Sequence, residues 1–226
     1  RPRHDPTMTP ERYAKLKRVL AARQPDLTVL MENVHKSHNI AAILRTCDAV
    51  GVFQANGVSD EGEIDRHHMV SGGSRKWVDV RLHPDLGAAC DSLRAGGHQI
   101  LAAHLSGGAK DYRSFNYTQP TAFLLGSELW GVTVRAASLA DAHVVIPMEG
   151  LTSSLNVSVA AALLLYEARR QREAAGLYVN CRLPPDVFER TLFEWSHPVI
   201  ARRCRERGLP YPALTEDGDL ADNPFA

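Results

Sequence analysis

The sequence predicts an α/β protein with a mostly parallel sheet that is flanked by helices. Two observations predict this fold class. Short apolar segments rich in strand-forming residues, such as 27–31, alternate along the chain with longer helical segments, such as 37–51. Several helical segments also end at a glycine, as this one does at Gly51, and glycine is a typical helix stop.

Thr9 is predicted to cap the first helix, because Pro10 follows it in the position where proline suits a helix start. Periodicity and turn residues predict the elements that come next. The elements of the first half are a helix at 9–23, a strand at 27–31, a helix at 37–51 capped near Ser37 or Asn39, a strand at 52–58, a strand that ends the segment 71–80, and a helix at 84–97.

A long helix over 154–175 dominates the second half. Polar side chains open it, and Ser153 or Ser154 is predicted to be its cap, while the apolar run behind them indicates burial. The other predicted elements are strands at 98–105, 121–126 and 143–148, a helix near 132–140, and two helices in the C-terminal tail at 185–195 and 198–207.

This pattern divides the chain into three predicted regions. A basic helical extension covers 1–26, and the core domain with its sheet covers 27–175. A second basic helical extension, which ends in an acidic tail, covers 176–226. The sequence contains no internal repeat and no low-complexity tract.

The composition is that of a globular protein, with 44% hydrophobic residues over 226 positions. No apolar run reaches the roughly 18–20 residues that span a membrane, and the N-terminus lacks the pattern of a secretory signal. The four cysteines are scattered without a CxxC pair, and no histidine group completes a ligand set. We therefore expect a cytoplasmic protein with reduced thiols, no membrane partner and no metal site.

The formal net charge is zero, but the charges are unevenly distributed. Residues 1–23 hold seven basic residues against two acidic ones, and residues 168–207 hold nine arginines against five acidic residues. This distribution suits a polyanion that is contacted by both ends of the chain. It equally suits solvated helix faces that keep the protein soluble, and charge alone does not separate the two interpretations.

Ligands of parallel α/β sheets bind beyond the carboxyl ends of the strands, so the segments after the predicted strands are candidate sites. No GxGxxG, GxxxxGK[ST] or GxSxG motif occurs in the chain. This argues against a Rossmann dinucleotide site, a P-loop and a nucleophile elbow. The candidate segments are 32–39, 104–107, 126–131 and 147–156.

Two charged residues have both a structural and a functional interpretation. Arg45 lies in an otherwise small and apolar helical segment. It is either a solvated arginine or a fixed guanidinium for phosphate or ribose oxygens. Glu128 lies between Gly126 and Gly131, just past a strand, and is either a turn residue or a hydrogen-bond acceptor for a ligand. Pattern alone leaves these alternatives open.

Three segments of the chain stand out as motifs: ENVHKSHNIAAILRTCDAVG at 32–51, LLGSELWGV at 124–132 and IPMEGLTSSLNVSVAAALLLYEA at 146–168. With these motifs the sequence resembles the SpoU-type branch of the SPOUT superfamily of RNA ribose 2′-O-methyltransferases, and within it the enzymes that methylate the tRNA D-loop guanosine. The order and spacing of the motifs are kept, and the segments that flank them are similar as well. Ser37, where a proline is common, and Leu129, where a polar residue is frequent, are small departures.

The resemblance implies a SPOUT fold in which the C-terminal part of the 27–175 domain forms a deep trefoil knot. It also implies a homodimer whose active sites use both chains, and S-adenosyl-L-methionine as the methyl donor. By motif position, the donor is expected to contact Ala103, Gly126, Ile146 and Leu155, chiefly through backbone groups, and to have Met148 beside its adenine.

The catalytic set that the resemblance implies is Arg45, Asn39, Glu128, Ser154 and Asn156. Arg45 is expected at the reacting ribose and its flanking phosphate. A guanidinium stays protonated at neutral pH, so we favour positioning and charge stabilisation for it, with general-base action left open. The other four are expected to orient ribose, donor and arginine by hydrogen bonds.

The resulting functional prediction is methylation of a tRNA ribose, most specifically the D-loop guanosine (Gm18), with S-adenosyl-L-methionine. Two alternatives are methylation of another tRNA or ribosomal RNA ribose and a knotted RNA-binding protein without activity. The basic ends then predict tRNA binding that weakens steeply with salt. The candidate phosphate contacts are Arg3, Arg12, Lys15, Arg18, Arg202, Arg203, Arg205 and Arg207.

Overall fold

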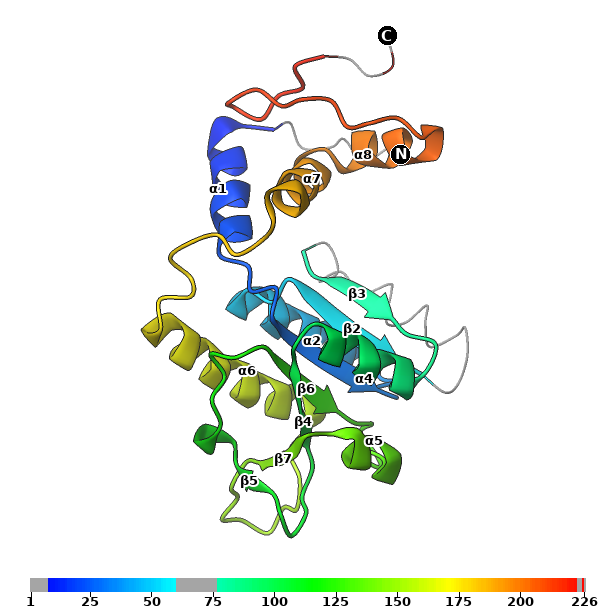
Figure 1. The fold of residues 1–226 in the computed structure, drawn as a ribbon, viewed down its shortest axis with the longest axis vertical. Helices are drawn as coiled ribbons and strands as arrows, with labels where there is room; N and C mark the ends of the chain where they lie inside the picture. The colour runs from blue at the N-terminus through cyan, green and yellow to red at the C-terminus, as the bar shows by residue number, and fades with distance from the viewer. Residues whose placement is uncertain (1–7, 60–76, 223–224, 226) are drawn as a thin grey trace. The chain divides into compact units, whose positions relative to one another are not determined.

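The computed structural model describes residues 8–59, 77–222 and 225, and it divides into two compact units (Figure 1). The larger unit comprises residues 24–178 and contains a seven-stranded sheet. The smaller unit combines the two ends of the chain, 1–23 and 179–226. Among the helices formed by the described residues, none has the length and apolar character needed to cross a membrane.

The sheet of the larger unit is parallel at every strand pair, which confirms the predicted fold class. The strand order is β3-β2-β1-β6-β4-β7-β5. Because β1 and β6 are neighbours, the loops that follow them leave the same edge of the sheet side by side. The strands are β1 (Leu27–Glu32), β2 (Gln54–Val58), β3 (Asp79–Leu82), β4 (Gln99–Ala103), β5 (Lys110–Asp111), β6 (Thr121–Leu125) and β7 (Ala142–Val145).

Helices cover both faces of this sheet (Figure 1). α2 and α6 pack against each other over one face, and their apolar sides belong to one hydrophobic core. α4 and α5 cover the other face with a second, smaller core. The four helices are α2 (Ser37–Val50), α4 (Leu86–Ala95), α5 (Val134–Leu139) and α6 (Val157–Ala174).

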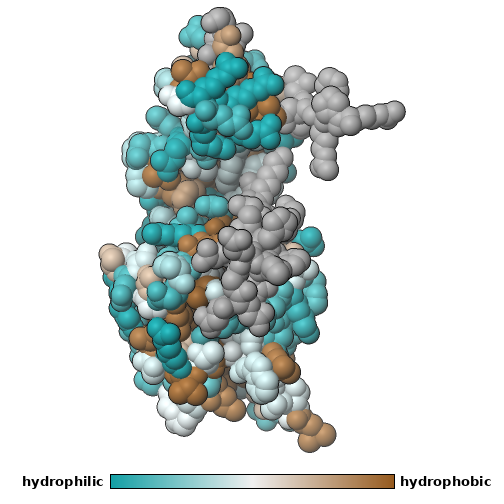
Figure 2. Space-filling model, turned by 90° about the vertical axis from the view of Figure 1, so that its right-hand side faces the viewer, coloured by the Kyte–Doolittle hydropathy of each residue, from teal (hydrophilic) through white to brown (hydrophobic). Residues whose placement is uncertain are grey.

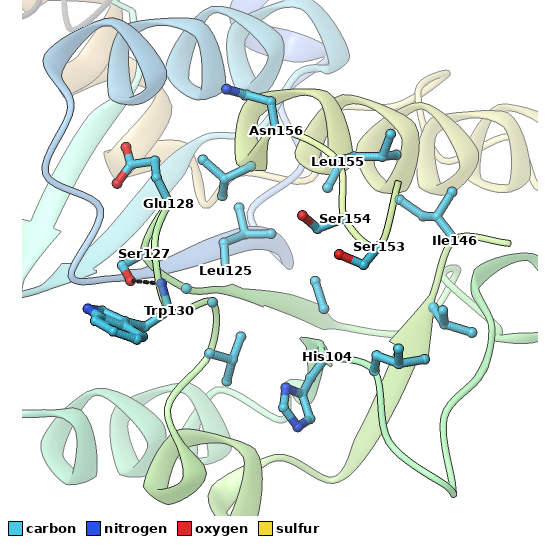
Figure 3. Close-up of a pocket in the computed structure, with 18 of the residues that line it drawn as sticks. His104, Leu125, Ser127, Glu128, Trp130, Ile146, Ser153, Ser154, Leu155 and Asn156 are labelled. Atoms are coloured by element: carbon cyan, nitrogen blue, oxygen red, sulfur yellow. Dashed lines mark hydrogen bonds between the residues drawn. The ribbon is translucent and has the colours of Figure 1, made fainter. Parts of the chain in front are cut away.

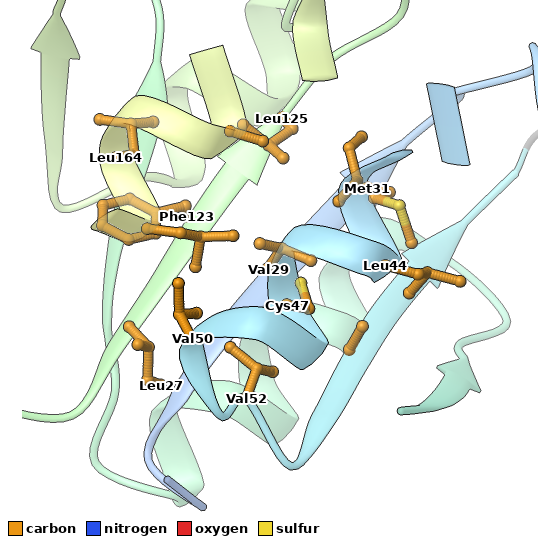
Figure 4. Close-up of a cluster of buried hydrophobic side chains, with 14 of the residues drawn as sticks. Leu27, Val29, Met31, Leu44, Cys47, Val50, Val52, Phe123, Leu125 and Leu164 are labelled. Atoms are coloured by element: carbon orange, nitrogen blue, oxygen red, sulfur yellow. The ribbon is translucent and has the colours of Figure 1, made fainter. Parts of the chain in front are cut away.

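The larger core lies between the sheet and the α2–α6 layer (Figure 4). Val50 of α2 and Leu164 of α6 are buried with Val29 and Phe123 of the two central strands. All six residues of β1 are buried, because a central parallel strand that is covered on both faces has no solvent side. This is why the segment 27–31 is continuously apolar instead of alternating.

The start of α6 differs from the prediction. The helix begins at Val157 instead of at 154, and its cap is Asn156, whose side chain accepts a hydrogen bond from the backbone N–H of Ser158 at 2.8 Å. Neither Ser153 nor Ser154 caps it. Serine and asparagine are equally good caps, so the path of the preceding loop decides which of them is used.

Other boundaries differ less. α2 ends at Gly51 in the left-handed conformation, as predicted, but its N-cap is Lys36 without a side-chain cap bond, so neither Ser37 nor Asn39 caps it. β7 ends at Val145, earlier than the predicted 148. The short β5 and the 3₁₀ turn at Tyr112–Ser114 were not predicted, because elements of two or three residues have no periodicity. The first part of the predicted strand segment 71–80 lies outside the described residues.

The described residues of the smaller unit form three helices at the predicted places. Each has a proline in its first turn, where the missing N–H costs nothing. α1 packs against α7, and the ring of Phe193 stacks on Tyr211 with centroids 4.6 Å apart. The helices are α1 (Pro10–Ala21), α7 (Pro185–Ser196) and α8 (Pro198–Arg207).

Arg172, near the C-terminal end of α6, is a fully buried arginine. Its guanidinium donates five hydrogen bonds, which include one of 2.6 Å to the Asp26 carboxylate and one to the Gln24 side chain. The remaining acceptors are main-chain oxygens before β1 and β6. Arg172 therefore belongs to the interior, and the basic surface expected over 168–207 does not include it.

We expect Arg172→Met to lower the free energy of unfolding by about 3–5 kcal/mol, because it removes five hydrogen bonds of a buried guanidinium, one of them to the largely buried Asp26 carboxylate. Urea unfolding of the variant measures this change. Arg170→Met is the matched control on the same helix. Arg170 is largely exposed in its pair with Glu167, so its loss should cost less than about 1 kcal/mol. Equal effects of the two substitutions would contradict the structural role of Arg172.

Candidate active site

A cavity of about 530 Å³ lies at the carboxyl ends of β4, β6 and β7 (Figure 3). Its walls are the loops that follow these strands and the segment that leads into α6. This is the edge where ligands of parallel α/β sheets bind, and the volume is in the usual range for small-molecule sites. The three segments after β4, β6 and β7 that the sequence analysis selected all contribute to it.

All five residues predicted to contact the methyl donor line this cavity. They come from four separate places in the chain and meet only through the strand order. Ala103 ends β4, Gly126 follows β6, Ile146 and Met148 follow β7, and Leu155 precedes α6.

The loop after β6 is a tight turn that requires two glycines. A Cβ atom on Gly126 would overlap the backbone of Gly131 and Val132, so no side chain fits at this position. Ser127 and Gly131 exchange backbone hydrogen bonds of 3.0 and 2.9 Å, which close the turn. Gly131 has a φ of +66°, a conformation that glycine adopts without strain. The cavity wall at this point is therefore bare backbone.

Large apolar side chains are exposed at the cavity and were missed by the sequence analysis. Leu129 and Trp130, at the tip of the turn, are 78% and 82% exposed, and Leu105 in the loop after β4 is 70% exposed. Apolar residues are otherwise scattered over the face drawn in Figure 2. An apolar pair between two glycines in a loop is the sequence signal that would have found Leu129 and Trp130.

A chain of hydrogen bonds joins three of the predicted catalytic residues. The Asn156 side chain donates to the Asn39 side-chain oxygen at 3.2 Å, and the Asn39 amide donates to the Glu128 carboxylate at 2.8 Å. The backbone N–H of Lys36 donates to the same carboxylate oxygen at 3.2 Å. The cluster thus ties the turn after β6, the start of α2 and the start of α6 together at the cavity.

The Glu128 carboxyl is held in its ionised form. Burial acts to raise its pKa, but hydrogen bonds from the Asn39 side chain and from the backbone N–H groups of Glu128, Lys36 and His35 outweigh burial and lower the pKa. A carboxylate accepts these donors better than a neutral acid does. The asparagine amides are consequently oriented by a fixed negative charge.

We expect the stabilising contribution of Glu128 to persist down to acidic pH. Because its pKa is lower in the folded state than the ordinary 4.5, the contribution is fully present above that value and is lost as the pH falls through the folded-state pKa. Thermal unfolding of the wild type and of Glu128→Gln between pH 7 and pH 3 measures this. The difference in melting temperature should stay constant at neutral pH and shrink only in acid. A difference that shrinks near pH 6 would contradict it.

The other two predicted catalytic residues lie differently. Ser154 is exposed in the loop before α6 and lines the cavity, and its carbonyl accepts a hydrogen bond from the Thr152 hydroxyl at 2.8 Å. Arg45 lies on the exposed side of α2, whereas Asn39 of the same helix is buried. Arg45 is not among the lining residues, and its side chain forms no hydrogen bond or ion pair within the described part of the chain. One chain therefore gathers four of the five residues and leaves Arg45 outside.

The predicted RNA contacts all belong to the smaller unit, except that Arg3 lies outside the described residues. Lys15, Arg18, Arg202 and Arg203 are exposed, and Arg202 forms an exposed ion pair with Glu206 at 3.9 Å. The other three are less available to a phosphate, because each is half-buried or contacts another side chain. Arg12 is half-buried, Arg205 binds the Glu194 carboxylate and the Tyr211 hydroxyl, and Arg207 lies over the Phe225 ring.

Two histidines, His104 and His143, contact each other beside the cavity. His104 lines the cavity, and its ring meets the edge of His143 with centroids 5.2 Å apart. His143 bonds the Ser106 hydroxyl at 2.7 Å and the Ala137 carbonyl oxygen at 3.0 Å, which ties the loop after β4 to β7 and α5. In the part of the chain that the structure describes, no group of three His, Cys, Asp or Glu residues is placed to hold a metal ion.

The parallel α/β sheet, the cavity formed by its loops and the polar cluster beside that cavity together define a ligand-binding domain of the kind found in enzymes. The sequence has no GxGxxG motif, so this is not a dinucleotide-binding domain of the Rossmann kind. The profile described as the SpoU rRNA methylase family matches residues 26–166, and the profile of its C-terminal region matches residues 170–223. The chain belongs to the SpoU rRNA methylase family.

Known proteins similar to this chain include curated enzymes and solved structures. It is 48% identical to the tRNA (guanosine(18)-2′-O)-methyltransferase of Escherichia coli K12, with 94% of each chain covered. The enzyme of the same name from Thermus thermophilus is 51% identical, with 83% of this chain and 96% of the relative covered. The crystal structure of the TrmH/SpoU tRNA modifying enzyme of A. aeolicus has a TM-score of 0.73 at 39% identity, covering 82% of this chain and 94% of that one. The AviRb methyltransferase of Streptomyces viridochromogenes, solved with the cofactor AdoMet, has a TM-score of 0.59 at 31% identity, covering 69% and 61%.

Proposed function

We propose that the protein transfers a methyl group from S-adenosylmethionine to the ribose 2′-hydroxyl of the D-loop guanosine, position 18, of tRNA. One observation carries the proposal. The hydrogen-bonded cluster of Asn39, Glu128 and Asn156 stands beside a cavity that all five expected donor contacts line. The names of the two curated relatives support the same reaction and the same nucleotide.

The cavity fits the methyl donor. The bare backbone at Gly126 allows the polar edges of a nucleoside to approach main-chain groups, and Ile146 and Met148 supply an apolar wall. Leu155 closes the site next to α6. S-adenosylmethionine, when bound, supplies an electrophilic methyl group on its sulfonium. The Glu128 carboxylate lies at this cavity and is compatible with a cationic ligand.

The polar cluster is proposed to hold the ribose. Glu128 accepts from Asn39 and thereby fixes the direction of that amide, and Asn39 accepts from Asn156. The Asn156 amide, which lines the cavity, carries a second N–H that can donate to a ribose oxygen, and the buried Asn39 fixes its orientation. Ser154 offers a hydroxyl on the cavity side of the same segment. Fixed donors of this kind orient a hydroxyl for in-line attack, which is where much of the rate gain of such a transfer comes from.

We also propose that the active form is a homodimer and that Arg45 completes the site of the partner chain. Two features support this. Arg45 is outside the cavity of its own chain, and α6 presents a stripe of exposed apolar residues, Val159, Leu163 and Tyr166, at helical spacing. α2, which carries Arg45, packs beside α6 in the same layer. A two-fold contact over this layer would bring each arginine towards the other chain.

Four exposed residues of the smaller unit are proposed as phosphate contacts: Lys15, Arg18, Arg202 and Arg203. We expect the dissociation constant for tRNA to rise steeply with salt, and the salt slope to fall by roughly one unit for each phosphate contact removed. Arg202→Ala and Arg203→Ala, combined, test this by filter binding at several salt concentrations. Arg135→Ala, an exposed arginine of the larger unit with no predicted role, is the control. A salt-independent dissociation constant would refute the assignment.

The decisive experiment is label transfer from S-adenosylmethionine to unmodified tRNA, followed by mapping of the modified nucleotide. Methyl label on the ribose of guanosine 18 is the expected result. The family description names ribosomal RNA, so a fragment of ribosomal RNA is the comparison substrate. Label in that fragment alone would redirect the proposal, and RNA binding without transfer would replace it by a non-catalytic role. The trefoil knot and the cytoplasmic location stay predictions.

A further inference from the structure

A buried carboxylate at the end of β1 takes no part in the site described so far. Glu32 is the last residue of β1, and only 3% of its surface is exposed. Its two oxygens accept hydrogen bonds from one residue, Thr133: the backbone N–H donates at 3.0 Å and the hydroxyl at 2.6 Å. A buried carboxylate is costly unless it is well paired, and this one is bound twice by a single partner.

Thr133 stands where the turn after β6 passes into α5. Its hydroxyl donates to Glu32 and accepts from the backbone N–H of Ala136, so the same group caps α5. The residue before it, Val132, lines the cavity, and the backbone of Val132 lies directly against Gly126. The backbones of Gly126 and Val132 are too close to move independently, so a shift of Thr133 must also move the cavity wall.

Two carboxylates brace the same pair of loops in opposite directions. Glu128, on the turn after β6, accepts from Lys36 and Asn39 beyond β1. Glu32, at the end of β1, accepts from Thr133 beyond that turn. We propose that Glu32 is a positioning residue for methyl transfer, which acts through Thr133 to hold the turn 126–132 where Glu128 and the donor-binding backbone are correctly placed. This inference rests on the proposed function for its kinetic consequence.

Thr133→Val tests the brace, because it removes the hydroxyl and keeps the shape of the side chain. We expect the Michaelis constant for S-adenosylmethionine to rise roughly ten- to a hundredfold, the change that loss of a hydrogen bond to a charged group produces. Glu32→Gln should have a similar effect, and the double variant should be no worse than the more damaged single variant. Thr133→Ser, which keeps the hydroxyl, should behave like the wild type.

Thr28→Val is the matched control for a merely structural role. Thr28 is on the same strand as Glu32 and is as buried as Glu32, at 3%. Its hydroxyl donates to the Gln54 carbonyl oxygen and accepts from the Asn56 side chain, both of β2, so it contacts no loop of the cavity. It should lower the melting temperature without changing the Michaelis constant for the donor. If Thr28→Val and Thr133→Val raise that constant equally, or if Thr133→Val leaves it unchanged, the inference is wrong.

A second readout separates the inference from the proposed function. Trp130 lies on the braced turn, so its emission in a Trp77→Phe, Trp195→Phe background reports the position of the turn without any turnover. Thr133→Val should shift that emission and weaken donor binding measured by calorimetry, while Thr28→Val should change neither. A wild type that transfers no methyl group would refute the proposed function alone. An unshifted Trp130 emission with unchanged donor binding would refute the brace alone.

Discussion

Arg45→Ala is expected to lower methyl transfer at saturating tRNA and donor by at least about a hundredfold, the usual cost of removing a group that stabilises developing charge. Donor binding should be unchanged, because Arg45 is assigned to the ribose and its phosphate, and the expected donor contacts that line the cavity do not include it. Single-turnover label transfer and calorimetry with S-adenosylmethionine measure the two quantities. Near-normal transfer by the variant would remove Arg45 from the mechanism.

Subunit mixing then tests whether Arg45 acts across the dimer. Arg45→Ala and Asn156→Ala are each expected to be inactive as pure dimers. If each site takes Arg45 from one chain and Asn156 from the other, one of the two sites of a mixed dimer is free of both substitutions. An equal mixture with random pairing should then recover roughly a quarter of the wild-type activity. If both residues act within one chain, every site of the mixed dimer carries one substitution, and no activity should return.

A chain that carries both substitutions gives the complementary test when it is mixed in excess with wild type. In a shared site, one such chain damages both sites of the mixed dimer, because it withholds Arg45 from one and Asn156 from the other. In a site built by one chain, it damages only its own. With the wild-type chain fully captured in mixed dimers, the shared site predicts near-complete loss of the activity per wild-type chain, and the single-chain site predicts that this activity is unchanged. Unchanged activity per wild-type chain would refute the shared site.

Gly126→Ala is expected to abolish measurable donor binding. The added Cβ would overlap the backbone of Gly131 and Val132, and main-chain atoms held by the Ser127–Gly131 hydrogen bonds cannot yield as a flexible side chain does. The turn must open or shift, and both change the cavity wall. Calorimetry with S-adenosylmethionine measures the loss, and circular dichroism checks that the sheet remains folded.

Gly108→Ala is the control for this substitution, because it adds the same methyl group to the loop after β4. A Cβ at Gly108 meets no atom within 4 Å, so donor affinity should change by less than about twofold. Donor binding by Gly126→Ala at wild-type affinity would show that the turn is more adaptable than its contacts indicate.

Local pattern was sufficient for most of the fold. The apolar run at 27–31 could be recognised as a strand because a central parallel strand is buried on both faces. α8 begins with Pro198 and is capped at its C-terminal end by Gly208, as helices commonly are. These features depend on residues close together in the chain. The prediction that Ser153 or Ser154 caps α6 was wrong, because the nearby Asn156 is an equally good cap and the path of the loop selected it.

The motifs carried the candidate site, but their resemblance to a family and not their periodicity assigned roles to Asn39, Glu128 and Asn156. Nothing local links residues that stand in three separate motifs. β1 and β6 are neighbours in the sheet, so the turn after one meets the loop after the other, and the two asparagines and two glutamates at that edge bind across it. The sequence alone therefore predicted the fold class, every described strand except the short β5, and the candidate side chains. Strand order, a long-range property of the packed core, determined which side chains meet, and it placed Arg172 in the interior and left Arg45 at the surface.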